Sequence, residues 1–119
     1  MLNQVTLIGR TTGDIELKES ENGKKFGIVT VATTRPFKDA GTDEYGTDFI
    51  DVSLWGKTAE NAVQHVGKGS AVSIRGRVAN RVIDIPSEQT FKTIGIIGDR
   101  VSFIQLKPPL TNNTNEASL

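Results

Sequence analysis

A strict alternation of side chains over residues 48–55 constrains the fold of this chain more than any other feature. Every second residue is a branched apolar residue, and the residues between are aromatic or polar. The first set is Ile50, Val52 and Leu54, and the second set is Phe49, Asp51, Ser53 and Trp55. Successive side chains of a β-strand point to opposite faces, so this period of two predicts a strand with one buried face.

The same period recurs along most of the sequence. Strands are predicted over residues 3–10, 26–34, 48–55 and 70–78, and over 90–97 and 101–106 with Gly98-Asp99 between these two as a turn or bulge. The segment 26–34 is β-branched on both faces, which predicts burial on both. Asn22-Gly23 is a strong hairpin turn signal before it, and residues 35–47, with two glycines, are expected to form a loop.

One segment has the period of a helix instead. Ala59, Ala62, Val63 and Val66 are spaced i, i+3, i+4 and i+7, and glycines follow directly. The predicted order is therefore three strands, one short helix and two strands. This order predicts an all-β fold, a five-stranded OB-fold Greek-key barrel with the helix between strands three and four.

The chain has room for one such domain in its 119 residues. Residues 1–106 are assigned to the barrel. Residues 107–119 read KPPLTNNTNEASL, and the paired prolines followed by small polar residues predict a disordered C-terminal tail.

Composition excludes several classes of protein. The chain has no cysteine and a single histidine, His65, which excludes disulfide scaffolds, thiolate metal sites and multi-histidine centres. It carries no phosphate-binding loop motif and no nucleophile elbow. We therefore expect no enzyme activity, no metal and no cofactor. No apolar run is long enough to cross a bilayer and no signal peptide is evident, so a cytoplasmic protein is expected.

The net charge is zero, with 14 basic and 14 acidic residues, but the charges are segregated. Residues 39–51 carry five acids and no base. Residues 68–81 carry four bases and no acid, namely Lys68, Arg75, Arg77 and Arg81. A neutral total can therefore hide a basic stripe, which is one mark of a nucleic-acid-binding surface.

Two large aromatic rings, Phe49 and Trp55, fall on the polar face of the best predicted strand. Aromatic rings hold single-stranded nucleic acid by stacking on bases, with little preference for sequence. Arg75 and Arg77 are expected on an adjacent strand, where guanidinium groups would bind phosphates. The same combination of an aromatic ring and cations recurs at Arg35, Phe37 and Lys38. The alternative is that a partner subunit or a loop covers the two rings.

Two stretches carry a family resemblance. The opening MLNQVTLIGRTTGDIEL and residues 47–81, TDFIDVSLWGKTAENAVQHVGKGSAVSIRGRVANR, resemble the bacterial and phage single-stranded DNA-binding proteins. The resemblance implies an OB-fold that binds single-stranded DNA without sequence preference and protects it in DNA replication, recombination and repair. It also implies a homotetramer, with a dimer as the alternative, in a bacterial cell or a phage-infected host cell.

The resemblance also assigns residues. Phe49, Trp55 and, less directly, Phe37 match stacking positions, while Lys57, Lys68 and Arg81 match basic positions along the DNA path. The complete predicted DNA-binding set is Arg35, Phe37, Lys38, Phe49, Trp55, Lys57, Lys68, Arg75, Arg77 and Arg81.

The end of the sequence departs from the family pattern. Cellular members typically end in an acidic run capped by Pro-Phe, which recruits replication and repair proteins, whereas this chain ends TNNTNEASL. Recruitment by that route is doubtful, and a phage- or plasmid-encoded member is favoured. Three other functions stay open: an OB-fold interaction module such as a primosome-type subunit, a single-stranded RNA binder, and a nuclease using the acids of residues 39–51.

Overall fold

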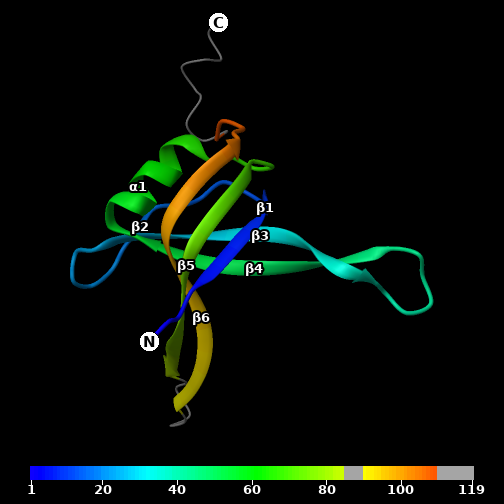
Figure 1. Ribbon diagram of the computed structural model, residues 1–119. Coiled ribbons are helices and arrows are strands. Elements are labelled where there is room, and N and C mark those ends of the chain that lie inside the picture. Colours follow the sequence, from blue (N-terminus) through cyan, green and yellow to red (C-terminus); the bar gives the residue numbers. More distant parts are fainter. Residues whose placement is uncertain (85–89, 110–119) are drawn as a thin grey trace, which may run out of the picture.

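Five strands close into a barrel in the computed structural model, with one helix at its end (Figure 1). The structure describes residues 1–84 and 90–109, with side chains placed in 1–80 and 94–109. The elements are β1 (Val5–Thr11), β2 (Lys18–Glu19), β3 (Lys25–Lys38), β4 (Tyr45–Trp55), α1 (Gly56–His65), β5 (Ala71–Asp84) and β6 (Thr90–Gln105).

The order of the strands defines the fold. The sheet runs β1-β5-β6-β4-β3-β2, and β1 also pairs with β3 at Arg10↔Ala32 and Thr11↔Val31, which closes the barrel. All pairs are antiparallel except β4 with β6, which run parallel. The helix connects β4 to β5. A five-stranded Greek-key barrel with a helix after its third long strand is an OB-fold, so the predicted fold is confirmed.

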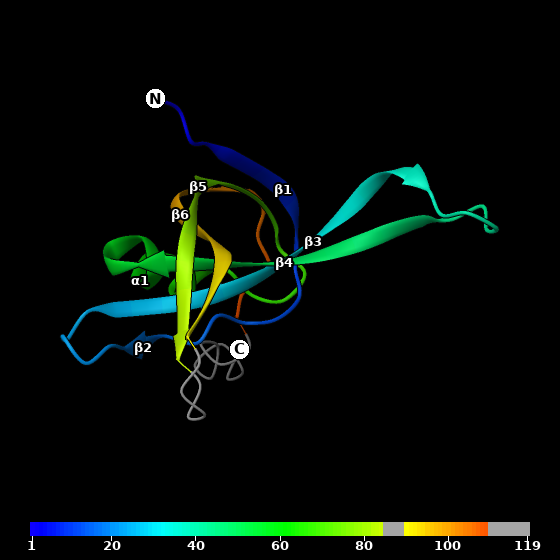
Figure 2. The same cartoon turned by 90° about the horizontal axis from the view of Figure 1, so that it is seen from below.

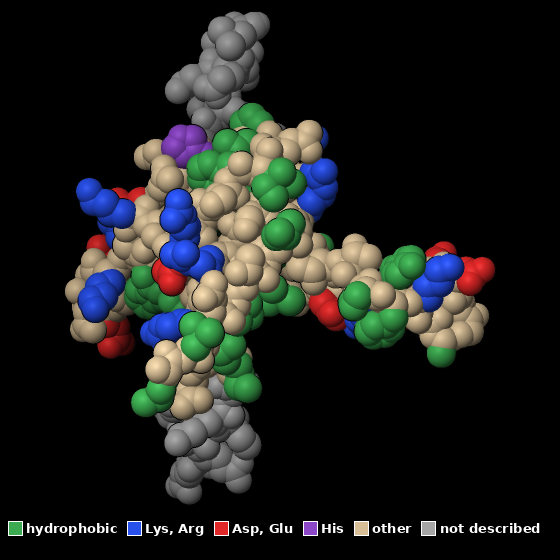
Figure 3. All heavy atoms as spheres, viewed as in Figure 1, with side chains coloured by type: hydrophobic (Ala, Val, Ile, Leu, Met, Phe, Trp, Pro, Cys, Tyr) green, Lys and Arg blue, Asp and Glu red, His purple; other side chains and the backbone are tan. Residues whose placement is uncertain are grey.

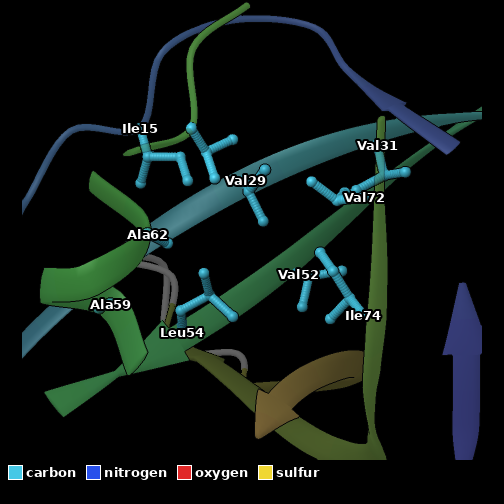
Figure 4. Packing of buried hydrophobic residues seen from close by; sticks show 10 residues of the cluster. Ile15, Val29, Val31, Val52, Leu54, Ala59, Ala62, Val72 and Ile74 are labelled. Atoms are coloured by element: carbon cyan, nitrogen blue, oxygen red, sulfur yellow. The ribbon is translucent and has the colours of Figure 1, made fainter. Parts of the chain in front are cut away.

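The barrel interior is filled by the branched side chains of the alternating strands, and α1 covers one end of it (Figure 4). Val31, Val52, Leu54 and Val72 are completely buried. From the helix, Ala59 and Ala62 pack against this core at the predicted helical spacing. The buried residues of the core are Ile15, Val29, Val31, Val52, Leu54, Ala59, Ala62, Val66, Val72 and Ile74.

The predicted loop over residues 35–47 is wrong in most of its length. β3 continues to Lys38 and β4 already begins at Tyr45, so the two strands form an arm that projects from the barrel (Figure 2). Only the tip turns, where the Asp39 N–H donates to the Glu44 carbonyl at 2.9 Å. Aromatic and β-branched residues favour extended backbone. Residues of these types keep β3 and β4 extended beyond the barrel despite Gly41 and Gly46.

Two further expectations about the strands need correction. Residues 26–34 are not buried on both faces, because Val29 and Val31 are buried whereas Ile28 is 40% exposed and Thr34 is exposed. Closing the barrel gives β3 one inner and one outer face. The last predicted strand pair is a single strand, β6, and Asp99 forms a bulge where the register shifts between Arg75 and Gly76.

The segment after β6 is still attached to the barrel where the structure describes it. The Lys107 carbonyl accepts from the Gly67 N–H at 2.6 Å, and the Lys107 N–H donates to Ser70 Oγ at 2.8 Å. The packed body therefore reaches at least to Lys107. The remainder of the predicted tail, residues 110–119, lies outside the described residues.

Candidate nucleic-acid interface

The outer face of β3 and β4 carries the aromatic residues that the alternation predicted. Directly opposite residues of an antiparallel pair share a face, and the register places Phe26 opposite Trp55 and Ala32 opposite Phe49. Phe49 is 67% exposed and Trp55 is 41% exposed, whereas Val52 between them is buried. Neither ring is packed inside the barrel.

Trp55 is part of a stacked pair. The rings of Phe26 and Trp55 lie 5.0 Å apart between centroids with an interplanar angle of 29°. Such an offset arrangement fixes the orientation of the indole. Phe26 was not predicted as a site residue, although its period-two spacing with Ile28 and Thr30 places it on the outer face.

The stacked pair lies in a groove of about 630 Å³. Its floor is formed by Phe26, Ile28 and Trp55, and Ala79 of β5 and Ile97 of β6 line its opposite wall. The remaining side is formed by residues of β2 and the following turn, Glu19, Ser20 and Glu21. The size is typical of clefts that hold small organic molecules, and nucleobases are within that range.

The arginines of β5 were predicted to lie on a strand adjacent to β4, and this prediction is wrong. β6 runs between the two strands, with Ile97 paired to Ser53 on one side and to Arg77 on the other. Arg77 is thus two strands from β4, about 10 Å away. The barrel topology separates the strands because the last strand inserts between the third and fourth long strands.

Arg77 lies beside the groove, whereas Arg75 does not. Arg77 is exposed and two residues along β5 from Ala79, which lines the groove. It forms no ion pair with another described residue. The predicted site residue Arg81 is on the same strand, but its side chain lies outside the described ones. Arg75 lies beyond the bulge, opposite Thr6 of β1, and its Nε is 3.6 Å from Asp99.

Arg35 on the arm is held by two carboxylates. Its Nε donates to Asp48 Oδ1 at 3.0 Å, its Nη2 lies 2.9 Å from the same oxygen, and its Nη1 lies 3.5 Å from Asp39. The hydrogen bond to Asp48 and the charge of Asp48, with a smaller contribution from Asp39, raise the pKa of Arg35. The guanidinium therefore already has anionic partners.

The rest of the arm shows the same arrangement. Lys38 lies 3.8 Å from Asp43 and 5.9 Å from the centroid of the Tyr45 ring. Phe37 and Tyr45 are 60% and 53% exposed. Tyr45 was not predicted as a site residue, although it shares the parity of Phe49 along β4. In Figure 3 acidic and basic side chains lie next to each other at the end of the arm.

The two remaining predicted lysines lie apart from the groove. Lys57, in the first turn of α1, lines a second hollow of about 570 Å³ together with Arg100 and Phe103. Lys68 precedes β5, whereas Arg81 lies near the other end of this strand, roughly 33 Å further along at 3.3 Å per residue. Of the described cations, Arg77 therefore lies beside the groove of Trp55, and Lys68 does not.

Neither a metal centre nor a membrane-spanning helix is found among the described residues. Among the described residues, no group of three or more His, Asp or Glu side chains is placed to hold a metal ion. Across residues 1–84 and 90–109, no helix has the length and apolar character needed to cross a membrane.

An OB-fold whose outer β3–β4 face carries exposed aromatic rings and a groove belongs to the class of barrels that bind oligonucleotides or oligosaccharides on that face. Sequence comparison defines the class further. Residues 2–104 match the family model described as the single-strand binding protein family. The chain belongs to this family.

Individual relatives are similar over most of their length. The chain is 36% identical to "Single-stranded DNA-binding protein B" of Bacillus subtilis (strain 168) over 108 residues, 91% of this chain and 95% of the relative. It is 35% identical to "Single-stranded DNA-binding protein 2" of Staphylococcus aureus (strain COL) over 113 residues, 95% of this chain and 78% of the relative.

Proposed function

We propose that the chain binds single-stranded DNA as a non-enzymatic OB-fold protein and protects unpaired strands in DNA replication, recombination and repair. The observation that carries the proposal is the exposed Trp55 ring, stacked on Phe26 on the floor of the groove. An exposed, oriented ring gives a base a surface on which to stack. Its relatives are bacterial proteins, and we propose that the chain acts on DNA in the cytoplasm.

Stacking and charge act together in this proposal. Each base that stacks on an aromatic ring contributes about 1–3 kcal/mol, and every base has a π-face, so binding tolerates any sequence. Arg77 is the described cation beside the groove that would bind phosphate, and Arg81, further along β5, is predicted to add a second phosphate contact. Phosphate binding releases counterions from the strand, so affinity should fall as salt is added.

The other predicted residues extend this surface. Phe49 continues the aromatic face toward the arm, where Phe37, Arg35 and Lys38 lie. Lys57, Lys68 and Arg75 would meet the strand only where it leaves the groove face. We assign them the smaller, purely electrostatic contributions of exposed cations.

We further propose that the protein acts as a homo-oligomer, a tetramer rather than a dimer. Ile8 of β1 and Ile104 of β6 are 64% and 59% exposed, and neither residue lines the groove. Apolar side chains exposed in this way favour association with a second copy. Mass measurement by light scattering tests this, and Ile8→Glu should lower the mass while leaving the barrel folded.

The function itself is tested by fluorescence. Trp55 is the only tryptophan, so its emission should be quenched as oligo-dT is added, with a weaker affinity at higher salt. Unchanged emission together with no change in the anisotropy of a labelled oligonucleotide would overturn the proposal. A matched oligo-rU that binds more tightly than oligo-dU would instead assign the protein to RNA.

A further inference from the structure

Two arginines face each other across the β5–β6 ladder. Arg75 of β5 pairs directly with Arg100 of β6, and both side chains are exposed. Directly opposite residues of an antiparallel pair have Cβ atoms about 4.5–5.5 Å apart, and like charges in these positions destabilise the sheet. An anion between the two guanidinium groups would remove this repulsion.

Hydroxyl groups complete the surroundings of the arginine pair. Thr6 of β1 lies opposite Arg75, and Ser73 of β5 lies opposite Ser102 of β6. These five residues line one hollow of about 240 Å³ on the outer face of β1, β5 and β6, which lie side by side (Figure 1). Among the described residues, none of the three hydroxyl groups has a hydrogen-bond partner. Their donors are therefore available to a ligand in the hollow.

Asp99 balances only part of the charge of the pair. Its Oδ1 lies 3.6 Å from Arg75 Nε, which is too long for a hydrogen bond. Arg100 forms no ion pair in the part of the chain that the structure describes. Each guanidinium has five N–H donors, so both arginines keep donors for a further anion.

We propose that this hollow binds a phosphate group between Arg75 and Arg100. Guanidinium groups bind phosphate oxygens through pairs of parallel hydrogen bonds, and the three hydroxyl groups supply further donors. The hollow is smaller than the roughly 300–1,000 Å³ of clefts that hold drug-sized molecules, so its size suits a small anion. None of its residues lines the groove of Trp55. The site is thus separate from the proposed stacking surface.

The test compares two variants of equal charge. Arg75→Gln with Arg100→Gln removes both guanidinium groups, and Lys24→Gln with Lys25→Gln removes two exposed cations that do not line the hollow. The melting temperature of each protein is measured at neutral pH in chloride and in increasing inorganic phosphate, at constant ionic strength.

The expected result is a saturable effect of phosphate that needs both arginines. The melting temperature of the unaltered protein and of the lysine variant should rise by about 4–8 °C at saturation, because a ligand that binds only the folded state stabilises it. The arginine variant should keep only the non-saturating rise that phosphate causes by its exclusion from protein surfaces. In chloride this variant should melt no lower than the unaltered protein, because the repulsion is gone. A saturable rise of equal size in all three proteins, or in none, would overturn the proposal.

Oligo-dT distinguishes a phosphate of the DNA backbone from free phosphate. If a strand supplies the phosphate, the arginine variant should lower the slope of log K against log salt by about 1.4. Free phosphate as the ligand leaves this slope unchanged, while the phosphate-dependent rise in melting temperature remains. The melting series contains no DNA, so a failure of the proposed single-stranded DNA binding would not affect its result.

The hollow also adjoins the proposed self-association surface, since Ile8 lies opposite Ser73. A second copy that covered this face would take the two guanidinium groups out of water, which is costly without an anion. Light scattering in both buffers therefore accompanies the melting series. A mass that rises with phosphate only when the arginines are present would place the anion between two copies, and a constant mass would place it on a free face.

Discussion

Two regions of the molecule combine aromatic rings with cations, and they differ in what the cations already bind. On the arm, Arg35 contacts Asp48 and Asp39, and Lys38 contacts Asp43. Beside the groove, Arg77 forms no ion pair with any other residue that the structure describes. Figure 1 shows the arm and the β5–β6 hairpin leaving the barrel in different directions.

The number of cations on a surface therefore does not predict how strongly that surface binds phosphate. A cation with an anionic partner must give up that partner, or share it, before it binds phosphate. Three of the five acids of residues 39–51, namely Asp39, Asp43 and Asp48, supply those partners. The groove should therefore contribute more to strand binding than the arm, although both have the same kinds of residue.

Trp55→Ala should have the largest effect of the substitutions that test this difference. Removing the stacking surface costs about 1–3 kcal/mol per base, which is roughly a fivefold to hundredfold loss of affinity. Phe37→Ala is the matched change on the arm and should cost less. Anisotropy of a labelled oligo-dT measures both variants without tryptophan emission. An equal loss in the two variants would remove the distinction between the regions.

The salt dependence of binding separates the two groups of cations. For single strands, each phosphate contact contributes about 0.7 to the slope of log K against log salt. Arg77→Ala with Arg81→Ala should therefore lower this slope by about 1.4. Arg35→Ala with Lys38→Ala removes the same charge and should lower the slope by less than about 0.7. The opposite order would show that the arm is the main phosphate contact.

Asp48→Asn should make Arg35 on the arm available to phosphate, as the cation beside the groove already is. Asp48 is the main cause of the raised pKa of Arg35, so its neutralisation frees the guanidinium for phosphate. Affinity for oligo-dT should rise by about two- to fivefold, the factor for one exposed ion pair, and the salt slope should steepen. Glu16→Gln makes an equal charge change away from the arm. An equal gain in both variants would trace the effect to net charge alone.

The fold was predictable because its signals are local. The alternation from Phe49 to Trp55 and the helical spacing of Ala59 and Ala62 each depend on a few consecutive residues, and the barrel follows from their order. The extent of β3 and β4 was not predictable in this way. Glycines at Gly41 and Gly46 indicated a loop, but pairing between the two strands outweighs local preference.

The site was predictable only in part, for a related reason. Parity alone placed Phe49 and Trp55 on the outer face, as the structure confirms. The position of Arg77 relative to Trp55 depends on which strand lies between them, and no local pattern shows that β6 inserts there. The ion pairs of Arg35 depend on the pairing of β3 with β4 and were missed for the same reason.

Gly46→Ala should have the smallest effect of these substitutions on the affinity for oligo-dT. A Cβ at this position would lie 2.7 Å from Arg35 Nη1 and 3.0 Å from both Asp39 carboxylate oxygens, which are the ends of flexible side chains and can move. The substitution should weaken the Arg35–Asp39 contact and leave the two contacts to Asp48 intact, because those use Nε and Nη2. Affinity for oligo-dT should change by less than about twofold. A gain as large as that of Asp48→Asn would mean that Asp39 rather than Asp48 keeps the guanidinium from phosphate.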